Sequence, residues 1–432
     1  MAIINANMVK TFHDNLFRNI ALMSSATVAA QLINVVIQPI LTRIVPAEAL
    51  GIFTFLVSMA NIVIPVASLK LDLLITSEAD DNRAQYITDV CIVITTIISL
   101  VFLLVISTGY IVRVNIFFQY GPIIFTVPLM VFTNGIRFLF ISYNNRYRQY
   151  KIIGLIGILR EFTRGVIQIV SGLLTFGALG QVAGYALAPI SGLKKQTKDY
   201  VQKFEKRDKL NYLIFKDIIT KGKNQILYLV PAQFLNSFSS SLVILFISML
   251  YSTEQLGYYS AGVRLLEVPM IFITANVSKV FYKQISEDVN LHHRVLPKFT
   301  KISLALLLIS ILGFGTLYLI APQFSRFVFG KGYEVAGDYI KCLCLMYVVR
   351  MVATSFTGLF TIFNKQQIEL GLNLFLIVAA SVVYIVSTKW NLPIISFMWL
   401  ISLSYTLMYI ILWLGYFSLC KSHDKRLTEN QK

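Results

Sequence analysis

Twelve long apolar runs separated by short polar segments constrain this chain more than any other feature of its sequence. Each run can cross a membrane as a helix, because a span needs about 20 mainly apolar residues. The composition agrees, since 56% of the 432 residues are hydrophobic and 14% are charged, which excludes a water-soluble enzyme and a disordered chain. The expected spans are 19–41, 50–70, 86–109, 116–140, 152–174, 176–193, 225–250, 257–279, 300–320, 337–362, 368–388 and 393–419.

The basic residues indicate how these spans are oriented. With a cytoplasmic N-terminus and no cleavable signal peptide, most of the 38 Lys and Arg residues fall in segments on the cytoplasmic side. The basic residues assigned to that side include Arg137, Arg146, Arg148 and Lys151. The net charge of +17 is therefore interpreted as a sign of membrane topology and not of nucleic-acid binding. The sequence predicts an all-α polytopic membrane protein with twelve transmembrane helices and both termini in the cytoplasm.

A short motif occurs twice, once in each half of the chain. Glu48–Phe53 and Glu254–Tyr259 share the pattern E-x-L-G-[IY]-[FY], and a proline follows each in the next span, Pro65 and Pro269. Both copies fall in outside loops after an odd-numbered span, so the two halves have the same orientation. Parallel repeats of this kind are related by an axis along the membrane normal. We therefore expect two parallel six-helix lobes around a central cavity.

A basic segment separates the two halves. Within it, Leu210, Ile214 and Ile218 recur at helical spacing. They predict a short amphipathic helix on the inner leaflet with lysines toward anionic headgroups, and a solvated linker is the alternative. The expected parts are an N-terminal lobe at 1–193, a cytoplasmic linker at 194–224, a C-terminal lobe at 225–420 and a cytoplasmic tail at 421–432.

We single out six of the ionisable residues that lie within the expected spans. They are Arg160, Glu161, Arg164, Arg264, Glu267 and Arg350. Such groups are costly in lipid and therefore tend to face a cavity or a partner. Glu161 can pair with Arg164 at i, i+3, which still leaves more arginine than glutamate. The excess predicts a cationic lining suited to an anionic substrate, and interhelical salt bridges are the alternative.

Polar side chains also follow one face of two expected spans. They are Gln31, Asn34 and Gln38 in span one, and Gln233 and Asn236 in span seven. In lipid such a stripe must face protein or water. It is interpreted either as the lining of a sugar path or as interhelical hydrogen-bond packing.

Two other features are interpreted as structural. Gly180 and Gly184 have the spacing of a close helix–helix contact. Asp72 and the acidic cluster 78–81 are expected to be solvated loop charges.

The familiar catalytic and nucleotide-binding motifs are missing from the sequence. It contains no G-x-x-x-x-G-K-[ST], H-E-x-x-H or G-x-S-x-G pattern, and its four cysteines do not have the spacing of a disulfide framework or a zinc site. We expect no catalytic residue, no metal and no cofactor, and no ATP-driven transport by this chain alone.

The chain resembles the polysaccharide-transport family of the multidrug/oligosaccharidyl-lipid/polysaccharide exporter superfamily, the bacterial repeat-unit flippases for O-antigen or capsule. The resemblance covers essentially the whole chain. It rests on segments 19–21, 38–43, 50–53, 68–72, 147–151, 256–260 and 280–282. The family often places an arginine in span eight at its substrate position, which corresponds here to Arg264. An Arg or Tyr commonly precedes the acidic residue after span two, but Leu71 stands here, so no role is carried to Asp72.

The resemblance implies movement of an undecaprenyl-diphosphate-linked oligosaccharide to the outer leaflet of the inner membrane by ion-coupled alternating access. As a hypothesis, Arg160, Arg164, Arg264 and Arg350 receive the diphosphate, while Glu161 or Glu267 exchanges a proton or sodium ion. The polar stripes would line the glycan path. The product would serve O-antigen lipopolysaccharide, capsule or exopolysaccharide synthesis, with a polysaccharide polymerase and a chain-length regulator as candidate partners and no nucleic acid.

Two other functions remain open at this point. A drug or cation antiporter of the same superfamily would share the fold, but it usually presents an acidic cavity. A membrane-embedded polysaccharide polymerase or ligase would also be polytopic and basic. Such enzymes typically have a large external loop with catalytic Arg and His, which this sequence lacks.

Overall fold

The computed structural model describes residues 25–204, 210–365 and 367–430, and every regular element in these ranges is helical. The all-α prediction is confirmed. The N-terminal tail, the first residues of expected span one and part of the linker lie outside the described residues. In the described ranges, ten helices are long and apolar enough to cross a membrane. They are Ser25–Ile44, Ala47–Val66, Asp81–Ile111, Gly121–Arg146, Gln225–Leu250, Thr253–Asn290, Leu296–Phe329, Glu334–Ile362, Gly371–Lys389 and Ile394–Glu429.

The helices at expected spans five and six are not among those long and apolar enough to cross a membrane. They are α7, Tyr150–Leu173, which carries three charged residues near its middle, and α8, Gly177–Leu187, which has 11 residues. Both are nevertheless part of the bundle, because α7 packs against α8, and α8 packs against α2 and α6. The number of twelve spans stays a prediction.

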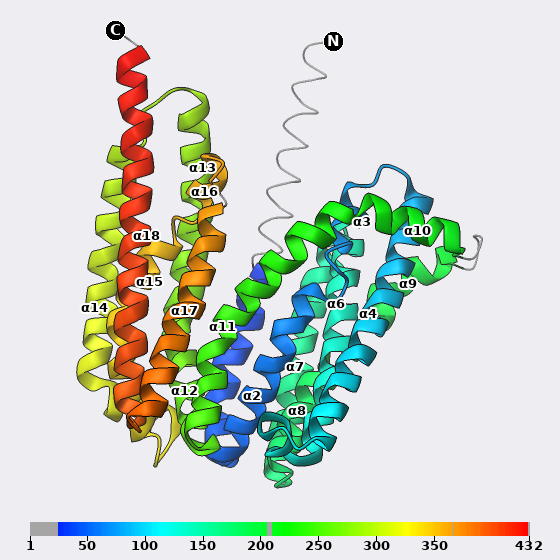
Figure 1. The fold of residues 1–432 in the computed structure, drawn as a ribbon, viewed down its shortest axis with the longest axis horizontal. Coiled ribbons are helices and arrows are strands. Elements are labelled where there is room, and N and C mark those ends of the chain that lie inside the picture. The colour runs from blue at the N-terminus through cyan, green and yellow to red at the C-terminus, as the bar shows by residue number, and fades with distance from the viewer. Residues whose placement is uncertain (1–24, 205–209, 366, 431–432) are drawn as a thin grey trace. The chain divides into compact units, whose positions relative to one another are not determined.

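The chain divides into two compact units between Ser237 and Phe238, inside helix α11. In the first unit, α2, α4, α6, α7 and α8 lie side by side (Figure 1). Its elements after Ser25–Ile44 are α2 (Ala47–Val63), η1 (Ile64–Val66), α3 (Asp72–Ser77), α4 (Asp81–Ile111), α5 (Asn115–Phe118), η2 (Gly121–Phe125), α6 (Thr126–Arg146), α7, α8, η3 (Ala188–Ile190), α9 (Leu193–Phe204), α10 (Tyr212–Lys221), η4 (Gln225–Leu229) and the start of α11 (Val230–Leu250).

The second unit is built around α15, which packs against α14, α18 and α12. Its elements are the end of α11, α12 (Thr253–Pro269), η5 (Met270–Thr274), α13 (Ala275–Asn290), α14 (Leu296–Phe329), α15 (Glu334–Thr354), α16 (Gly358–Ile362), α17 (Gln367–Lys389) and α18 (Ile394–Asn430). Asp424 of α18 accepts hydrogen bonds from the backbone amides of Val295 and Leu296 at 2.9 and 3.1 Å, which fixes the start of α14.

The repeated motif occupies equivalent positions in two equivalent helices. Glu48 is the second residue of α2 and Glu254 is the second residue of α12, and both helices have 17 residues. The regular α-helix α12 ends at Pro269, whereas α2 ends at Val63, two residues before Pro65. Proline has no N–H to donate within a helix, which favours a change of helix type near both prolines. Pro65 lies within a 3₁₀ turn that leads into a loop, whereas a π-helix follows Pro269 and continues into α13. The two units therefore share this 17-residue helix and differ in the structure that follows it.

The expected amphipathic helix of the linker exists as α10, but its apolar face contacts protein. Ile218 is 1% exposed within a hydrophobic cluster that includes Leu71 and Ile75, and Leu210 and Ile214 pack against the same cluster. Burial against the bundle removes Ile218 and part of Leu210 and Ile214 from both lipid and water, so neither interpretation of the linker describes it fully.

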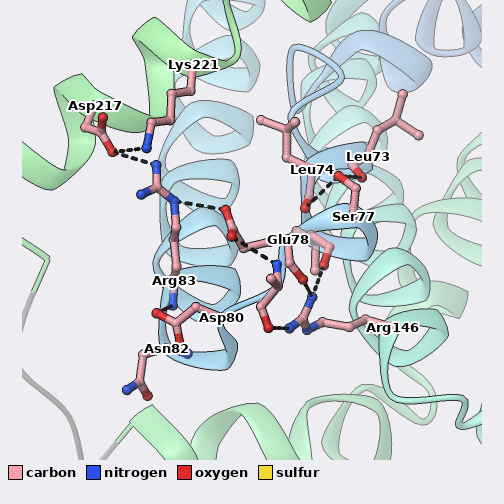
Figure 2. A network of polar contacts seen from close by, with 12 residues as sticks. Leu73, Leu74, Ser77, Glu78, Asp80, Asn82, Arg83, Arg146, Asp217 and Lys221 are labelled. Carbon is pink, nitrogen blue, oxygen red and sulfur yellow. Dashed lines mark hydrogen bonds and ion pairs between the residues drawn. The ribbon is translucent and has the colours of Figure 1, made fainter.

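Polar contacts bind the α3–α4 loop and α10 to the rest of the first unit (Figure 2). The Arg146 guanidinium donates to the backbone carbonyls of Ile75, Glu78 and Ala79 and pairs with Asp81 at 2.8 Å. The Arg83 side chain bridges Glu78 and Asp217 at 2.9 and 2.6 Å.

These contacts correct the expectation that the acidic cluster is simply solvated. Asp72 is also held, since it accepts hydrogen bonds from Ser68 at 2.6 Å and Ser142 at 3.1 Å. Two of the partners, Ser142 and Arg146, lie 70 and 65 residues along the chain from the carboxylates that they bind. Sequence spacing alone could not show these contacts.

Small residues allow α7 and α8 to approach closely, as the glycine spacing predicts. A Cβ at Gly184 would lie 2.5 Å from Gln168 Cγ, and one at Gly180 would lie 2.2 Å from Ser171. The close approach lets the Gln168 and Gln181 side-chain amides donate to each other's backbone carbonyls at 3.0 and 3.1 Å.

Gly184→Val is expected to destabilise the protein by about 1–3 kcal/mol, the usual cost of overpacking a close contact. The branched side chain would push α8 away from α7 and break the two glutamine bonds. Thermal unfolding in detergent measures the loss. Gly157→Val on α7 is a suitable control, because no atom lies within 4 Å of a Cβ built there. Equal melting temperatures for the two variants would contradict the packing argument.

Candidate functional site

The first unit contains a pocket of about 210 Å³ between the helix Ser25–Ile44, α6 and α7. Its polar lining consists of Thr27, Gln31, Arg137, Arg160 and Glu161, and its other lining residues are alanine, isoleucine and glycine. Glycine and alanine leave the space in which the longer polar side chains can meet a ligand. The pocket thus has the general character of a small-molecule site, with an apolar wall and a few convergent polar groups.

Glu161 lies between two arginines of its own helix. Its carboxylate pairs with Arg160 and, at 2.8 Å, with Arg164, and only 3% of its side chain is exposed. The pairing of Glu161 with Arg164 is the one that the i, i+3 spacing predicts. Because one carboxylate faces two guanidinium groups, α7 retains an excess positive charge in the bundle.

Arg137 corrects the charge assignment made from the sequence. It was placed with the cytoplasmic residues, but it lies in α6, about 13 Å before the helix ends at Arg146, at roughly 1.5 Å rise per residue. Apolar residues on both sides of Arg137 are the sequence signal that could have revealed this position. With Arg137, the first unit holds three arginines against Glu161.

Tyr185 is a second residue of this site that the sequence did not indicate. It comes from α8, donates its hydroxyl hydrogen to Asn61 Oδ1 of α2 at 3.1 Å, and interacts electrostatically with Arg137, Arg160 and Arg164. No pattern distinguishes it among the 22 tyrosines of the chain. Residues from five helices of the first unit therefore converge around the pocket.

The other expected ionisable residues lie in the second unit. The Arg350 guanidinium lies 5.0 Å from the centre of the Tyr347 ring, and Glu267, Tyr259 and Tyr409 act on it electrostatically. The tertiary structure thus brings Glu267 of α12 near Arg350 of α15. Arg264 is half-buried and interacts electrostatically with Tyr333. The four predicted diphosphate ligands are divided equally between the two units.

The predicted glycan residues do not form one lining. Among the described residues, Gln31 lines the pocket, whereas Asn34 is half-buried outside it and Gln38 is 8% exposed. The Gln233 amide donates to Ser237 at 3.4 Å, and Asn236 is exposed. Their role in glycan binding stays a prediction.

The chemistry of the first-unit pocket is anion binding. Planar guanidinium groups donate paired hydrogen bonds that match phosphate and carboxylate oxygens, and Arg137 and Arg160 approach the same space from two helices. In the described part of the chain, no group of three or more His, Cys, Asp or Glu side chains is placed to hold a metal ion.

Solved transporter structures share the fold over almost the whole chain. The lipid II flippase MurJ, in an inward closed conformation, has a TM-score of 0.73 at 12% identity and covers 94% of this chain and 91% of its own. An inward-facing multidrug resistance MATE family transporter of the MOP superfamily has a TM-score of 0.63 at 15% identity, covering 94% and 99%. A MOP superfamily transporter from Pyrococcus furiosus has 0.57 at 14%, covering 95% and 96%. This multi-pass membrane protein therefore has a fold similar to that of MurJ and of the MATE family transporters.

The sequence comparison identifies the family. The family model described as "Polysaccharide biosynthesis protein" matches residues 40–338, well over half of the chain. The search of curated proteins found no match to this chain. The chain belongs to this polysaccharide biosynthesis family. The resemblance inferred from the sequence motifs is confirmed at the level of a polysaccharide biosynthesis family.

Proposed function

We propose that this protein moves undecaprenyl-diphosphate-linked oligosaccharide repeat units from the cytoplasmic to the outer leaflet of the bacterial inner membrane. The cationic pocket of the first unit carries the proposal, because Arg137 and Arg160 line it and Glu161 balances only part of the arginine charge. The family's association with polysaccharide biosynthesis and a fold shared with a lipid II flippase support it. The product would enter O-antigen, capsule or exopolysaccharide synthesis.

The diphosphate supplies the negative charge that this pocket lacks. Arginine in a membrane bundle is costly unless it has a partner, and a diphosphate offers several oxygens to two guanidinium groups at once. We assign Arg137 and Arg160 to this contact in the first unit, and Arg264 and Arg350 in the second. Arg164 would act through Glu161. The polyprenyl chain can remain in lipid, so the protein needs to shield only the polar end.

The glycan and the coupling ion have their own candidate residues. Gln31 is the best placed for the glycan, because it lines the same pocket as the two arginines. Alternating access between the two units would expose the site to each leaflet in turn. A proton or sodium ion exchanged at Glu161 or Glu267 would reset the cycle, with both termini on the cytoplasmic side.

Depletion of the protein is expected to leave lipid-linked oligosaccharide on the cytoplasmic face of the inner membrane. Its leaflet location can be measured by accessibility to an added glycosidase or lectin in right-side-out and inverted vesicles. Complementation with the wild-type chain should restore accessibility from outside. Single repeat units that accumulate on the outer face would contradict the proposal and favour a polymerase or ligase. A polymerase and a chain-length regulator would act on the delivered units.

Arg264→Glu is expected to reduce polysaccharide export strongly at normal protein level, because it would place a repelling carboxylate beside the diphosphate. Surface polysaccharide measured by gel and staining provides the readout. Intact export would remove Arg264 from the binding site and leave the first-unit arginines as its basis.

A further inference from the structure

Glu161 is an acidic residue in a pocket that is otherwise suited to anions. It lines the pocket together with Arg160 and Arg137, and it is paired with the Arg160 guanidinium. The Glu161 carboxylate is therefore already paired with Arg160, one of the two arginines that line the pocket. Such an arrangement makes the carboxylate a competitor of any bound anion.

Arg164 gives Glu161 a second partner outside the pocket lining. The two side chains approach to 2.8 Å at i, i+3 on α7, and 19% of the Arg164 side chain is exposed. If Arg160 turned to a ligand, Glu161 would keep the Arg164 pair, so no carboxylate would be left buried without a cation. That matters, because breaking a buried ion pair completely costs about 3–5 kcal/mol.

Arg137 has donor capacity left for a ligand. Its Nε atom is buried and has no hydrogen-bond partner among the described residues, and its guanidinium lies 4.1 Å from the centre of the Phe138 ring. The aromatic ring orients the guanidinium without using its N–H donors. Arg137 and a released Arg160 would thus present two planar donor groups to the same space.

We propose that Glu161 is an internal counter-ion of Arg160, which a phosphate-bearing ligand displaces while Glu161 remains paired with Arg164. This inference rests on the proposed function and adds how the site can release its ligand. Two unopposed guanidinium groups in a low-dielectric pocket would hold a diphosphate tightly. Competition from the Glu161 carboxylate lowers the affinity for the diphosphate. When the ligand leaves, Glu161 pairs with Arg160 again, so Arg160 is not left without a counter-ion.

Glu161→Gln is expected to tighten diphosphate binding about tenfold or more, because glutamine has nearly the same shape but no charge to compete for Arg160. Affinity can be measured by calorimetric titration of inorganic diphosphate into the purified full chain in phosphatidylcholine nanodiscs. Arg160→Gln in the same background should abolish the gain. Glu48→Gln, at an exposed position in the first turn of α2, is the matched control and should leave the affinity unchanged.

The variants also separate displacement from a structural role. Loss of a merely structural ion pair would weaken binding and lower the melting temperature, whereas loss of a competitor strengthens binding. Unchanged or weaker diphosphate binding by a folded Glu161→Gln protein would overturn the proposal, as would a gain that persists without Arg160. No binding by any variant would also overturn it, while the leaflet measurement tests the flippase function separately.

A second titration identifies the source of the phosphate. Nanodiscs that contain phosphatidylglycerol offer a phospholipid headgroup as a rival ligand. Equal diphosphate affinity in both kinds of nanodisc is expected for a site that binds the diphosphate of a lipid-linked sugar. Affinity that falls as phosphatidylglycerol rises would assign the pocket to membrane lipid and would overturn the displacement by a diphosphate.

Discussion

Reversal of the charge at Arg160 is expected to abolish export while the protein still accumulates in the membrane. Arg160→Glu removes the two excess positive charges of the first-unit cluster and adds a carboxylate to the pocket that Arg160 lines. Hydrogen bonds to charged groups contribute about 1.5–3 kcal/mol each, so loss of a paired contact predicts a fall in affinity of about a hundredfold. Surface polysaccharide and the leaflet location of the lipid-linked intermediate measure the effect.

The control for this reversal lies on the same helix. Lys151→Glu changes the charge by the same amount in the exposed first turn of α7, away from the pocket lining, and export should remain within twofold of wild type. Arg160→Gln should give an intermediate loss, because it removes one cation without adding an anion. Full export by the Arg160→Glu protein would exclude the first-unit pocket from substrate binding.

Arg146→Ala is expected to destabilise the protein by about 1–3 kcal/mol, because the part-buried carbonyls of Ile75 and Glu78 would lose a charged donor. The Arg146 side chain is 10% exposed and holds three backbone carbonyls of the α3–α4 connection together with Asp81. The Tyr147 hydroxyl also donates to Asp81, at 3.3 Å, so the backbone carbonyls are the acceptors most affected by the loss of Arg146. Thermal unfolding in detergent should show a lower midpoint, and limited proteolysis should cut first at residues 78–81.

Arg83→Ala supplies the comparison within the same network. Arg83 also bonds two partners, but both are carboxylates, and its side chain is 28% exposed, with Asp217 at 48%. Exposed ion pairs contribute about 0–1 kcal/mol, so this variant should be at most slightly less stable than wild type. If the two variants lost equal stability, burial of the carbonyl contacts would not explain the role of Arg146.

The membrane architecture could be predicted because it depends on local chemistry. In lipid, a single segment can form all its backbone hydrogen bonds internally only as a helix. A long apolar run such as 225–250 is therefore sufficient to predict the helix at Gln225–Leu250. The prolines that follow the repeated motif lie within expected spans 50–70 and 257–279, and the helix type changes near each of them. The Glu161–Arg164 pair follows from helical spacing alone. The close packing at Gly184 follows from the small residues of α8.

The composition of the pocket depended on contacts between distant segments. Arg137 was counted with the cytoplasmic cations although expected span 116–140 contains it, and the packing of α6 against α7 places it beside Arg160. Tyr185 joins the site because α8 packs against both α2 and α7. Likewise, the apolar face of α10 contacts protein and not lipid, because the bundle offers a matching cluster around Leu71.

The sequence by itself therefore determined the helices, the internal repeat and the excess of arginine within the spans. Each of these follows from the neighbours of a residue along the chain and from the cost of polar groups in lipid. The tertiary structure decided which arginines share a pocket, which carboxylate opposes them and which helix faces are covered. Those features require contacts between segments that are far apart in the chain. A periodic apolar pattern predicts that a helix has a buried face, but it does not indicate which other helix packs against that face.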